Sequence, residues 1–549
     1  MSAEQIDTPQ TLPKLITSDY TAISEPEIPS AFLPIGRLVH WNNTPTFGRV
    51  GVLIDPLHEV HPGQFVAVWH GRRNRAVLTV AQVGDCFEVN PNEDPELAAA
   101  RERLGLGTAY AGESASTRIF RLATCDTIED LEIEIEEGGS FKMIGSRSPD
   151  ALARAGDPVV LLPDELAQDT IGSLRDPNQG LDVGTSKGVS EFNVTLRPDV
   201  VQMHAGLFGN PGKGKSYLGG VLLEEAHKWG IPTLVLDING EFIDLARSLN
   251  GLVITLPDRA QFGLSLNLLT PPELVSIAPN VQPRTQYAEL IELAHDQLRN
   301  EKRGSDITFD ELKRRINDLG ETLKTVKTSV GAAVSRITAL ERDPLIGPGT
   351  SFDFIKSLIN HGIVVLDCRY LSLRQTQLIA AAAARTLQKY GRDMTQKANK
   401  GDAEAGGWFA MLFIDEAHAV APNSEDVVST QVLYELARMG RHVRTGLVLS
   451  SQSPADLDRS ILKRLQTRFV FALEKDQLAS IGGVSADLGE DLQRQLPKLA
   501  RGVCAVSGSS EIIKHGFLLR VRARATPVGG STPPVFAGRN KKQPKKSNT

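Results

Sequence analysis

The chain has 549 residues, of which 41% are hydrophobic and 23% charged, with a formal net charge of −6. This composition is ordinary for a globular protein of two or three domains, and the four isolated cysteines indicate neither a zinc site nor a disulfide framework. Because no apolar stretch approaches the roughly 20 residues that span a bilayer, and the N-terminus has no secretory-signal pattern, we expect a cytoplasmic protein without membrane contact.

The first third of the sequence predicts an arm followed by a β domain. Residues 1–30 are rich in Pro, Ser, Thr and Glu, which is typical of a disordered N-terminal arm. Over residues 31–165, short alternating or β-branched runs such as "RVGVLI", "QFVAVW" and "DPVVLL" are separated by turn residues. Short strands at this spacing predict a small β-barrel or sandwich.

From residue 166 to 525 the pattern becomes that of an α/β domain. Apolar strands are predicted at 203–209, 232–238, 362–368, 408–416 and 445–452, with amphipathic helices between them. This alternation predicts a parallel sheet covered by helices on both faces. Residues 271–346 carry helical patterns only and predict a helical insertion, whereas residues 526–549 form a basic tail without acids.

A phosphate-binding loop is the strongest local signal. "GNPGKGKS" fits G-x-x-x-x-G-K-[ST] between a predicted strand and a predicted helix. In such a loop the backbone N–H groups and the helix N-terminus face phosphate oxygens, the lysine reaches the β- and γ-phosphates, and the serine binds Mg²⁺. The motif thus predicts a site for ATP and Mg²⁺, with these residues in contact with the nucleotide: Gly209, Asn210, Pro211, Gly212, Lys213, Gly214, Lys215, Ser216 and Tyr217.

Hydrolysis also needs a metal-holding acid and a group that orients water. "MLFIDE" supplies both at the end of a predicted central strand. We expect Asp415 to hold Mg²⁺ together with Ser216, and Glu416 to polarise the attacking water.

Further polar residues follow neighbouring strands. Gln452 ends a strand at the edge where ligands bind in open α/β sheets, which suggests a γ-phosphate sensor. Arg441, or else Arg438, is predicted to act as an arginine finger across a subunit boundary, and Arg444 stands beside them; a solvated basic helix end is the alternative. Asp237, with Glu241 behind it, either positions metal or water or caps the next helix.

The letters "DEAH" at 415–418 do not make the chain a DEAH-box helicase. Such an enzyme needs a second RecA-like domain after the first, and only about 130 residues follow Glu416. Those residues are already used by the rest of the first sheet and the tail. We expect His418 either to couple the site to the next helix or, as we favour, to serve packing.

Over residues 33–525 the sequence resembles the HerA family of the FtsK–HerA translocases. The motifs that carry the resemblance are "GNPGKGKS", "LDINGEF", "LFIDEAHAVAP", "ARMGRHVRTGLVLSSQSPADLD" and "GVCAVSG…FLLRVRAR". The resemblance implies a HAS-barrel followed by a RecA-like ATPase core, and a homo-hexameric ring with double-stranded DNA in its pore. Two departures are Asn239, where relatives often have His, and "SQSP" in place of the usual Gln-Arg-Pro.

The resemblance further implies an ATP-driven DNA translocase or helicase that works with a NurA-like partner nuclease in DNA end resection and repair. An antiphage complex with a sirtuin-like or nuclease effector is the alternative. A conjugation-type coupling ATPase usually carries membrane helices, which the sequence lacks. A nucleotide-binding module without motor activity is the remaining possibility.

Overall fold

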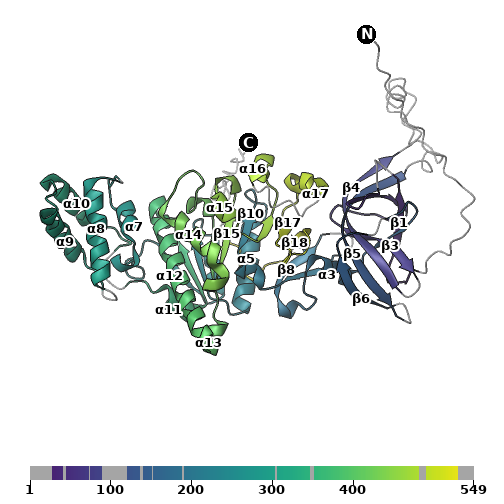
Figure 1. Cartoon of the computed structure of the whole chain (residues 1–549), viewed down its shortest axis with the longest axis horizontal. Coiled ribbons are helices and arrows are strands. Elements are labelled where there is room, and N and C mark those ends of the chain that lie inside the picture. The colour runs from purple at the N-terminus through teal and green to yellow at the C-terminus, as the bar shows by residue number, and fades with distance from the viewer. Residues whose placement is uncertain are drawn as a thin grey trace, which may run out of the picture.

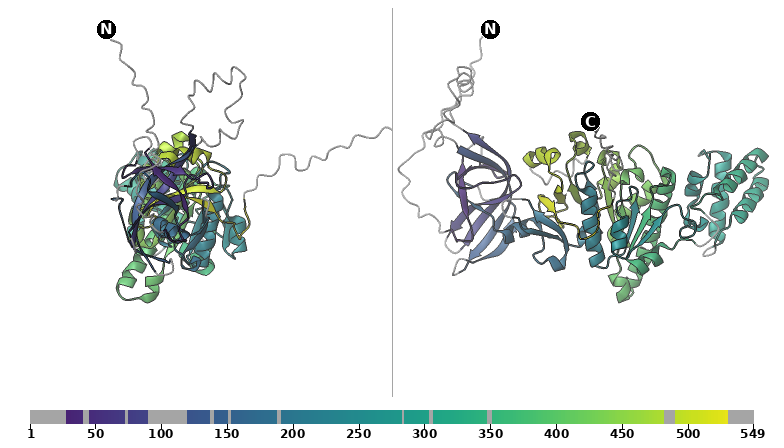
Figure 2. Two further views of the ribbon diagram at one scale, coloured as in Figure 1. Left: turned by 90° about the vertical axis from the view of Figure 1, so that its right-hand side faces the viewer. Right: turned by 180° about the vertical axis from the view of Figure 1, so that it is seen from behind.

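The computed structural model describes residues 28–40, 45–72, 75–89, 120–136, 140–150, 153–187, 191–282, 284–302, 306–346, 351–480 and 490–529. The arm predicted over 1–30 and the tail predicted over 526–549 fall almost entirely outside these ranges. The described part is elongated, with a β domain at one end, the α/β core in the middle and the helices α8 to α10 at the other end (Figure 1). The view from behind in Figure 2 shows the same order.

The N-terminal sheet closes into a barrel. Its strands are β1 (Pro34–Val39), β2 (Arg49–Ile54), β3 (Phe65–Arg72), β4 (Arg75–Val89), β5 (Phe120–Ile135), β6 (Phe141–Arg147) and β7 (Pro158–Leu161). They follow the order β2-β1-β7-β3-β4-β5-β6, and the additional antiparallel pairing of β2 with β5 completes the ring. Small and β-branched side chains, among them Val50, Val52, Val66 and Val68, fill a compact cluster. Closure pairs both edges of strands β1 to β5 and β7, and β6 extends the sheet beside β5.

The second sheet has eleven strands among the described residues. They are β8 (Leu181–Ser186), β9 (Asn193–Leu196), β10 (Ala205–Phe208), β11 (Thr233–Asp237), β12 (Leu252–Thr255), β13 (Ile363–Asp367), β14 (Ala410–Ile414), β15 (Thr445–Ser451), β16 (Thr467–Val470), β17 (Val503–Gly508) and β18 (Phe517–Val521). Their order is β12-β13-β11-β14-β15-β10-β16-β17-β18-β8-β9. The predicted parallel sheet is present from β12 to β16, and the antiparallel extension from β17 to β9 was not predicted.

Helices cover both faces of the parallel strands. The α-helices formed by the described residues are α3 (Asp164–Ile171), α4 (Asp199–Gln202), α5 (Lys215–Lys228), α6 (Ile243–Ser248), α7 (Pro271–Ile277), α8 (Gln286–Glu301), α9 (Phe309–Thr322), α10 (Lys327–Leu340), α11 (Phe354–His361), α12 (Leu373–Asn399), α13 (Ala403–Gly407), α14 (Val428–Met439), α15 (Arg459–Leu462), α16 (Lys475–Ser480) and α17 (Glu490–Gln495). Successive residues of one strand point to opposite faces. Accordingly Leu412 packs with the cluster of α12 and α14, whereas Phe413 packs with that of α5 and α6.

The predicted insertion consists of helices. Within its described residues, 271–346 contains α7 to α10, which pack on one another and share a hydrophobic cluster with the core. A buried ion pair fastens it: both guanidinium nitrogens of Arg385 on α12 lie 2.6–3.0 Å from both carboxylate oxygens of Glu273 on α7. The same carboxylate accepts the backbone N–H of Thr270 at 2.7 Å and so caps α7.

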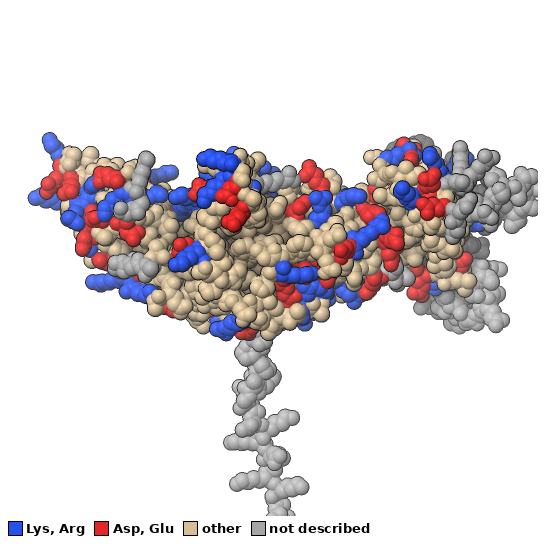
Figure 3. All heavy atoms as spheres, turned by 90° about the horizontal axis from the view of Figure 1, so that it is seen from below, with Lys and Arg blue, Asp and Glu red and all other residues tan. Residues whose placement is uncertain are grey.

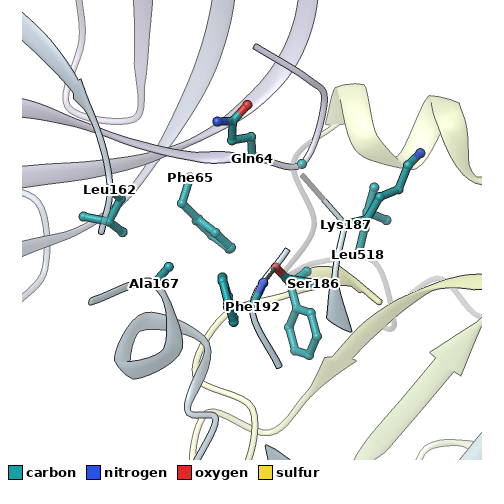
Figure 4. Close-up of a pocket in the computed structure, with 10 residues that line it drawn as sticks. Gln64, Phe65, Leu162, Ala167, Ser186, Lys187, Phe192 and Leu518 are labelled. Carbon is teal, nitrogen blue, oxygen red and sulfur yellow. Dashed lines mark hydrogen bonds between the residues drawn. The ribbon is translucent and has the colours of Figure 1, made fainter. Parts of the chain in front are cut away.

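The barrel packs directly on the α/β core. Phe65 and Trp69 of β3 belong to the same hydrophobic cluster as core residues such as Phe517, and the Gln82 amide donates to the Gly516 carbonyl at 3.1 Å. A small pocket lies at this junction, with Phe65 on the barrel side and Leu518 on the core side (Figure 4). Only Lys187 in its lining carries a charge, so the pocket is a packing gap and not the candidate site.

Candidate nucleotide-binding site

The phosphate loop joins the buried strand β10 to helix α5. Gly212 and Gly214 have φ angles of 73° and 123°, which side-chain-bearing residues rarely adopt. The loop is braced from the neighbouring strand ends: the Asn210 N–H donates to the Ala472 carbonyl at 3.0 Å, and the Lys213 carbonyl accepts the Gly502 N–H at 2.8 Å. The bend therefore keeps its shape without a ligand.

The two acids of the predicted catalytic pair lie beside this loop. Strand β14, which they follow, is separated from β10 by β15 alone. The Lys215 ammonium lies 3.1 Å from Glu416 Oε1 and 3.8 Å from Asp415 Oδ1. The Ser450 hydroxyl, from the end of β15, donates to Asp415 Oδ1 at 2.9 Å. The structure thus brings three chain segments together at the carboxyl edge of the sheet.

Glu416 is held in an unusual backbone conformation. Its φ of 45° and ψ of 51° are left-handed, which costs a non-glycine residue conformational energy and is found preferentially at functional sites. Its carboxylate accepts hydrogen bonds from the side-chain amides of Asn239, at 3.3 Å, and of Gln452. The Gln452 backbone N–H, at 3.4 Å, and the Lys215 ammonium also donate to it, so several donors fix the position of this carboxylate.

Burial dominates the electrostatics of the pair. Asp415 is completely buried, and desolvation raises its pKa to about 7. The negative charges of Glu416 and Glu241 raise the pKa further, whereas Lys215 and the Ser450 hydroxyl oppose the rise. A buried acid with so high a pKa gains from a nearby cation, because a positive charge stabilises its ionised form.

The residues fit a nucleoside triphosphate with Mg²⁺. The first N–H groups of α5 have no partner within the helix and face the loop, and Ser216 in the first turn is only partly buried. A serine hydroxyl and one carboxylate are a sufficient protein share for Mg²⁺, which keeps waters and phosphate oxygens as its other ligands. In the described part of the chain no group of three or more His, Cys, Asp or Glu side chains could hold a metal by itself.

Two polar contacts of the site were not among the predicted site residues. The Asn239 amide bridges the pair, since it also donates to Asp415 Oδ2 at 3.3 Å. His418 makes polar contacts as well: its Nδ1 lies 3.2 Å from the Ser451 hydroxyl and 3.5 Å from Glu416 Oε2. The polar residues at the end of β15 could have indicated the His418–Ser451 contact. The sequence does not show which distant segment pairs with them.

Asp237, predicted either to position metal or water or to cap the next helix, accepts hydrogen bonds from the loop that precedes α6 and not from the helix itself. Its Oδ1 accepts the N–H groups of Gly240 and Glu241 at 2.7 and 3.0 Å, and its Oδ2 accepts that of Phe242 at 2.8 Å. Burial raises its pKa to about 6, against the lowering effect of these N–H groups. Its oxygens are thus engaged in fixing the loop that carries Asn239, and Asp237 acts on the site through that loop.

The side chain of Tyr217, a residue predicted to contact nucleotide, contacts the C-terminal segment. Its hydroxyl accepts the Arg524 N–H at 2.8 Å, and the Arg524 guanidinium lies 5.7 Å from its ring centroid. The neighbouring Arg522 pairs with Glu224 and Glu225 of α5, both at 2.9 Å. This segment therefore straps the helix that begins at the phosphate loop.

The three arginines lie at the other edge of the sheet. They precede β15, whose first residue, Thr445, pairs with Ala410 at the start of β14. Parallel strands share their amino ends, so this turn is a full strand length away from the chain's own phosphate loop. Arg438 is exposed, and the Arg441 side chain lies outside the described part. Arg444 donates to the carbonyl of Gly406, which gives it a structural role.

The comparisons with known proteins agree with this geometry. A family model described as "Helicase HerA, central domain" matches residues 181–387. The DNA double-strand break repair helicase HerA of Sulfolobus acidocaldarius is 26% identical over 396 residues, 70% of this chain and 77% of that protein. The enzyme of the same name from Pyrococcus furiosus is 23% identical over 507 residues, 79% of this chain and 89% of that protein. Residues 181–387 thus match the HerA central domain, and the chain is similar to HerA helicases over most of its length.

With its phosphate loop and its likeness to the HerA helicases, the chain is a P-loop ATPase. Among solved structures it is similar to VirB4 of Thermoanaerobacter pseudethanolicus, with 16% identity, a TM-score of 0.49 and coverage of 64% of this chain and 99% of that one. The bacterial conjugative coupling protein TrwB is similar with 14% identity, a TM-score of 0.46 and coverage of 67% and 94%. None of the helices formed by the described residues is long and apolar enough to cross a membrane.

Proposed function

We propose that this HerA-like ATPase is a DNA translocase that forms a closed homo-oligomeric ring, six subunits by resemblance, in which each hydrolysis site is completed by the next subunit. The observation that carries the proposal is the division of polar groups between the two edges of the parallel sheet. Lys215, Glu416 and Gln452 meet at the carboxyl edge, and the arginine turn lies at the amino edge.

Within one subunit, the substrate is ATP. Lys215 and the N–H groups at the start of α5 bind its phosphates, and Ser216 and Asp415 hold Mg²⁺. When bound, Mg²⁺ neutralises negative charge on the phosphate oxygens. Glu416 accepts the proton of the attacking water, and Gln452, which contacts Glu416, orients that carboxylate and reports on the γ-phosphate.

The proposed role of Lys215 includes release of the base. Its ammonium lies 3.1 Å from Glu416 Oε1. Phosphate oxygens carry more negative charge than this single carboxylate, so ATP binding draws Lys215 away. Glu416 then keeps its contacts with Asn239, Gln452 and His418. Loss of the ammonium contact leaves its carboxylate available to the attacking water.

A neighbouring copy supplies the missing positive charge. An arginine that contacts the transferred phosphoryl group increases kcat by about 10³–10⁵ in related reactions. Arg444 is tied to a carbonyl, so the finger is Arg441 or Arg438. A head-to-tail interface that brings one subunit's amino edge to the next subunit's carboxyl edge closes into a ring.

Double-stranded DNA is the proposed track, and a NurA-like nuclease the proposed partner. The name of the relatives, DNA double-strand break repair helicase, favours the repair pathway over the antiphage alternative. On the face seen in Figure 3, Lys and Arg are interspersed with Asp and Glu. That face offers no continuous basic track, as the net charge of −6 also suggests, so contacts with DNA phosphates belong in a pore assembled from several copies.

The test is ATP hydrolysis with and without linear double-stranded DNA. DNA should stimulate wild-type turnover in a salt-sensitive way. Glu416→Gln should lower kcat on the order of 10²–10⁴-fold with little change in ATP binding. The matched control is Glu425→Gln, an exposed acid in the following loop, which should leave turnover unchanged. DNA-independent hydrolysis that survives Glu416→Gln would contradict the proposal.

A further inference from the structure

Buried His204 lies outside every motif of the sequence, directly before the strand that leads to the phosphate loop. It is only 4% exposed and has a φ of 65°, a left-handed conformation that is rare for residues with a side chain. Its carbonyl accepts the N–H groups of Gln466 and Thr467 at 3.1 and 3.2 Å. The backbone of His204 is thereby locked to β10 on one side and to β16 on the other.

The imidazole connects this strand to the arginine turn. Its Nδ1 accepts the Leu447 N–H of β15 at 3.0 Å, and the Ala437 carbonyl accepts a hydrogen bond from the ring. That carbonyl is one of the last four of α14, which have no partner within the helix. Ala437 directly precedes Arg438, so the imidazole fixes the backbone that carries one candidate finger.

The ring also packs against Gly440, which directly precedes Arg441. A Cβ at Gly440 would lie 2.2 Å from both Cε1 and Nε2 of His204, so no larger residue fits there without movement of the turn or the ring. From the other side, Thr395 of α12 donates to the His442 carbonyl at 2.8 Å. The turn is thus clamped between α12 and His204.

We infer that His204 is a positioning residue for the trans-acting arginine, and that it sets where Arg438 and Arg441 stand relative to the phosphate-loop strand of the same subunit. The inference rests on the proposed function, because the arginines act on a neighbour's ATP. A displacement of about 1 Å in such a group can cost on the order of 10² in rate. Loss of the ring should therefore impair the next subunit's site and leave the chain's own site intact.

The test uses His204→Asn, because asparagine tolerates the left-handed conformation but is too short to span from β15 to α14. We expect kcat to fall on the order of 10²-fold, with KM for ATP unchanged. His295→Ala is the matched control: His295 is equally buried, its Nε2 lies 2.9 Å from the Leu266 carbonyl, and burial likewise lowers its pKa to about 4, but it lies in the insertion.

Mixed assemblies separate positioning from general damage. His204→Asn is co-expressed with Lys215→Ala, which has a dead site but an intact arginine turn, and assemblies that contain both are purified through two tags. Turnover several-fold above that of either variant alone supports the inference. In such assemblies the intact ATP site of a His204→Asn subunit meets the intact arginine turn of a Lys215→Ala subunit. If His204→Asn fails to fold, Gly440→Ala, which displaces the same turn, takes its place with the same expected outcomes.

The Arg438→Ala/Arg441→Ala double variant, co-expressed with Lys215→Ala, is the reference. If the reference pair regains turnover and the His204 pair does not, the inference is wrong and the proposed function stands. The inference is equally wrong if His204→Asn alone keeps wild-type kcat. If the reference pair also fails to regain turnover, the trans arrangement is wrong and the role of His204 falls with it.

Discussion

The two edges of the parallel sheet differ in how their polar groups are satisfied. At the carboxyl edge, Asp415, Glu416 and Lys215 are buried and contact one another. At the amino edge the backbone of the arginine turn is fixed by His204 and α12, but Arg438 points outward and is exposed. The first edge is organised to receive a ligand from solution, and the second presents a charge on a rigid support.

Under the proposed function, this difference makes a single chain an incomplete enzyme. A rigidly mounted arginine at the far edge cannot contact its own chain's nucleotide, because the length of the strands separates them. The same arrangement is complete when copies associate head to tail. Each of the following predictions tests one edge against the other.

The largest effect is expected at the amino edge. The Arg438→Ala/Arg441→Ala double variant should lower kcat by about 10³, while KM for ATP stays close to that of the wild type because the phosphate loop is untouched. Steady-state ATPase assays measure both values. Arg247→Ala, which removes an exposed arginine paired only with Asp244 at 3.5 Å on α6, is the control and should change neither. Full activity of the double variant would remove the functional distinction between the edges.

A second prediction concerns the buried charge of the carboxyl edge. The pKa of Asp415 is about 7 in the folded chain against 3.8 without burial. The folded state therefore retains a proton that the unfolded state has lost between these values, and stability falls as the pH rises through this window. Asp415→Asn has no such cost. Its free energy of unfolding relative to wild type should rise by roughly 2–4 kcal/mol between pH 4 and pH 8.

This prediction is checked by denaturant unfolding of nucleotide-free protein in EDTA at both pH values. When the free energy of unfolding of wild type is subtracted from that of Asp415→Asn, the contributions from titration of all other groups cancel. Asp244→Asn, at an exposed position, should give no such change. A pH-independent difference for Asp415→Asn would mean that the carboxylate is stabilised in its ionised form without a bound cation.

The smallest effect is expected for the residue that aligns the two acids. Asn239→Ala removes an amide that donates to both Asp415 and Glu416, and should lower kcat about tenfold through lost orientation. Asn239→His, which keeps one donor, should recover part of the loss. Asn423→Ala is the control, because that amide contacts only the Ala455 carbonyl in a nearby loop. Unchanged kcat in Asn239→Ala would show that the other contacts suffice to align the pair.

At the carboxyl edge of the sheet, local patterns predicted individual residues but not the contacts between them. The glycine spacing around Lys215 and the apolar run before Asp415 are consequences of short-range geometry, so both could be predicted from sequence. The contact between Lys215 and Glu416 spans 201 residues, and only the strand order β14-β15-β10 brings them together. Asn239 and Ser450 were not predicted as site residues for the same reason.

Other differences have equally specific causes. Asp237 follows a buried strand, as a catalytic acid would, but its oxygens accept hydrogen bonds from three consecutive backbone N–H groups. No sequence pattern distinguishes an acid that acts on a ligand from one that fixes a loop. The antiparallel strands β17, β18, β8 and β9 are short and come from two distant parts of the chain. Their pairing depends on the fold as a whole. In the first third of the chain the alternation pattern likewise predicted strands but left a barrel or a sandwich open.

The measurement that tests the divided site most directly is the turnover of assemblies that mix Lys215→Ala with Arg438→Ala/Arg441→Ala. Each variant alone should be nearly inactive, for opposite reasons. When co-assembled, an intact phosphate loop of one subunit meets the intact arginines of the other, and hydrolysis should rise several-fold above both parents. Parents that remain inactive together, in assemblies shown to contain both, would contradict the account.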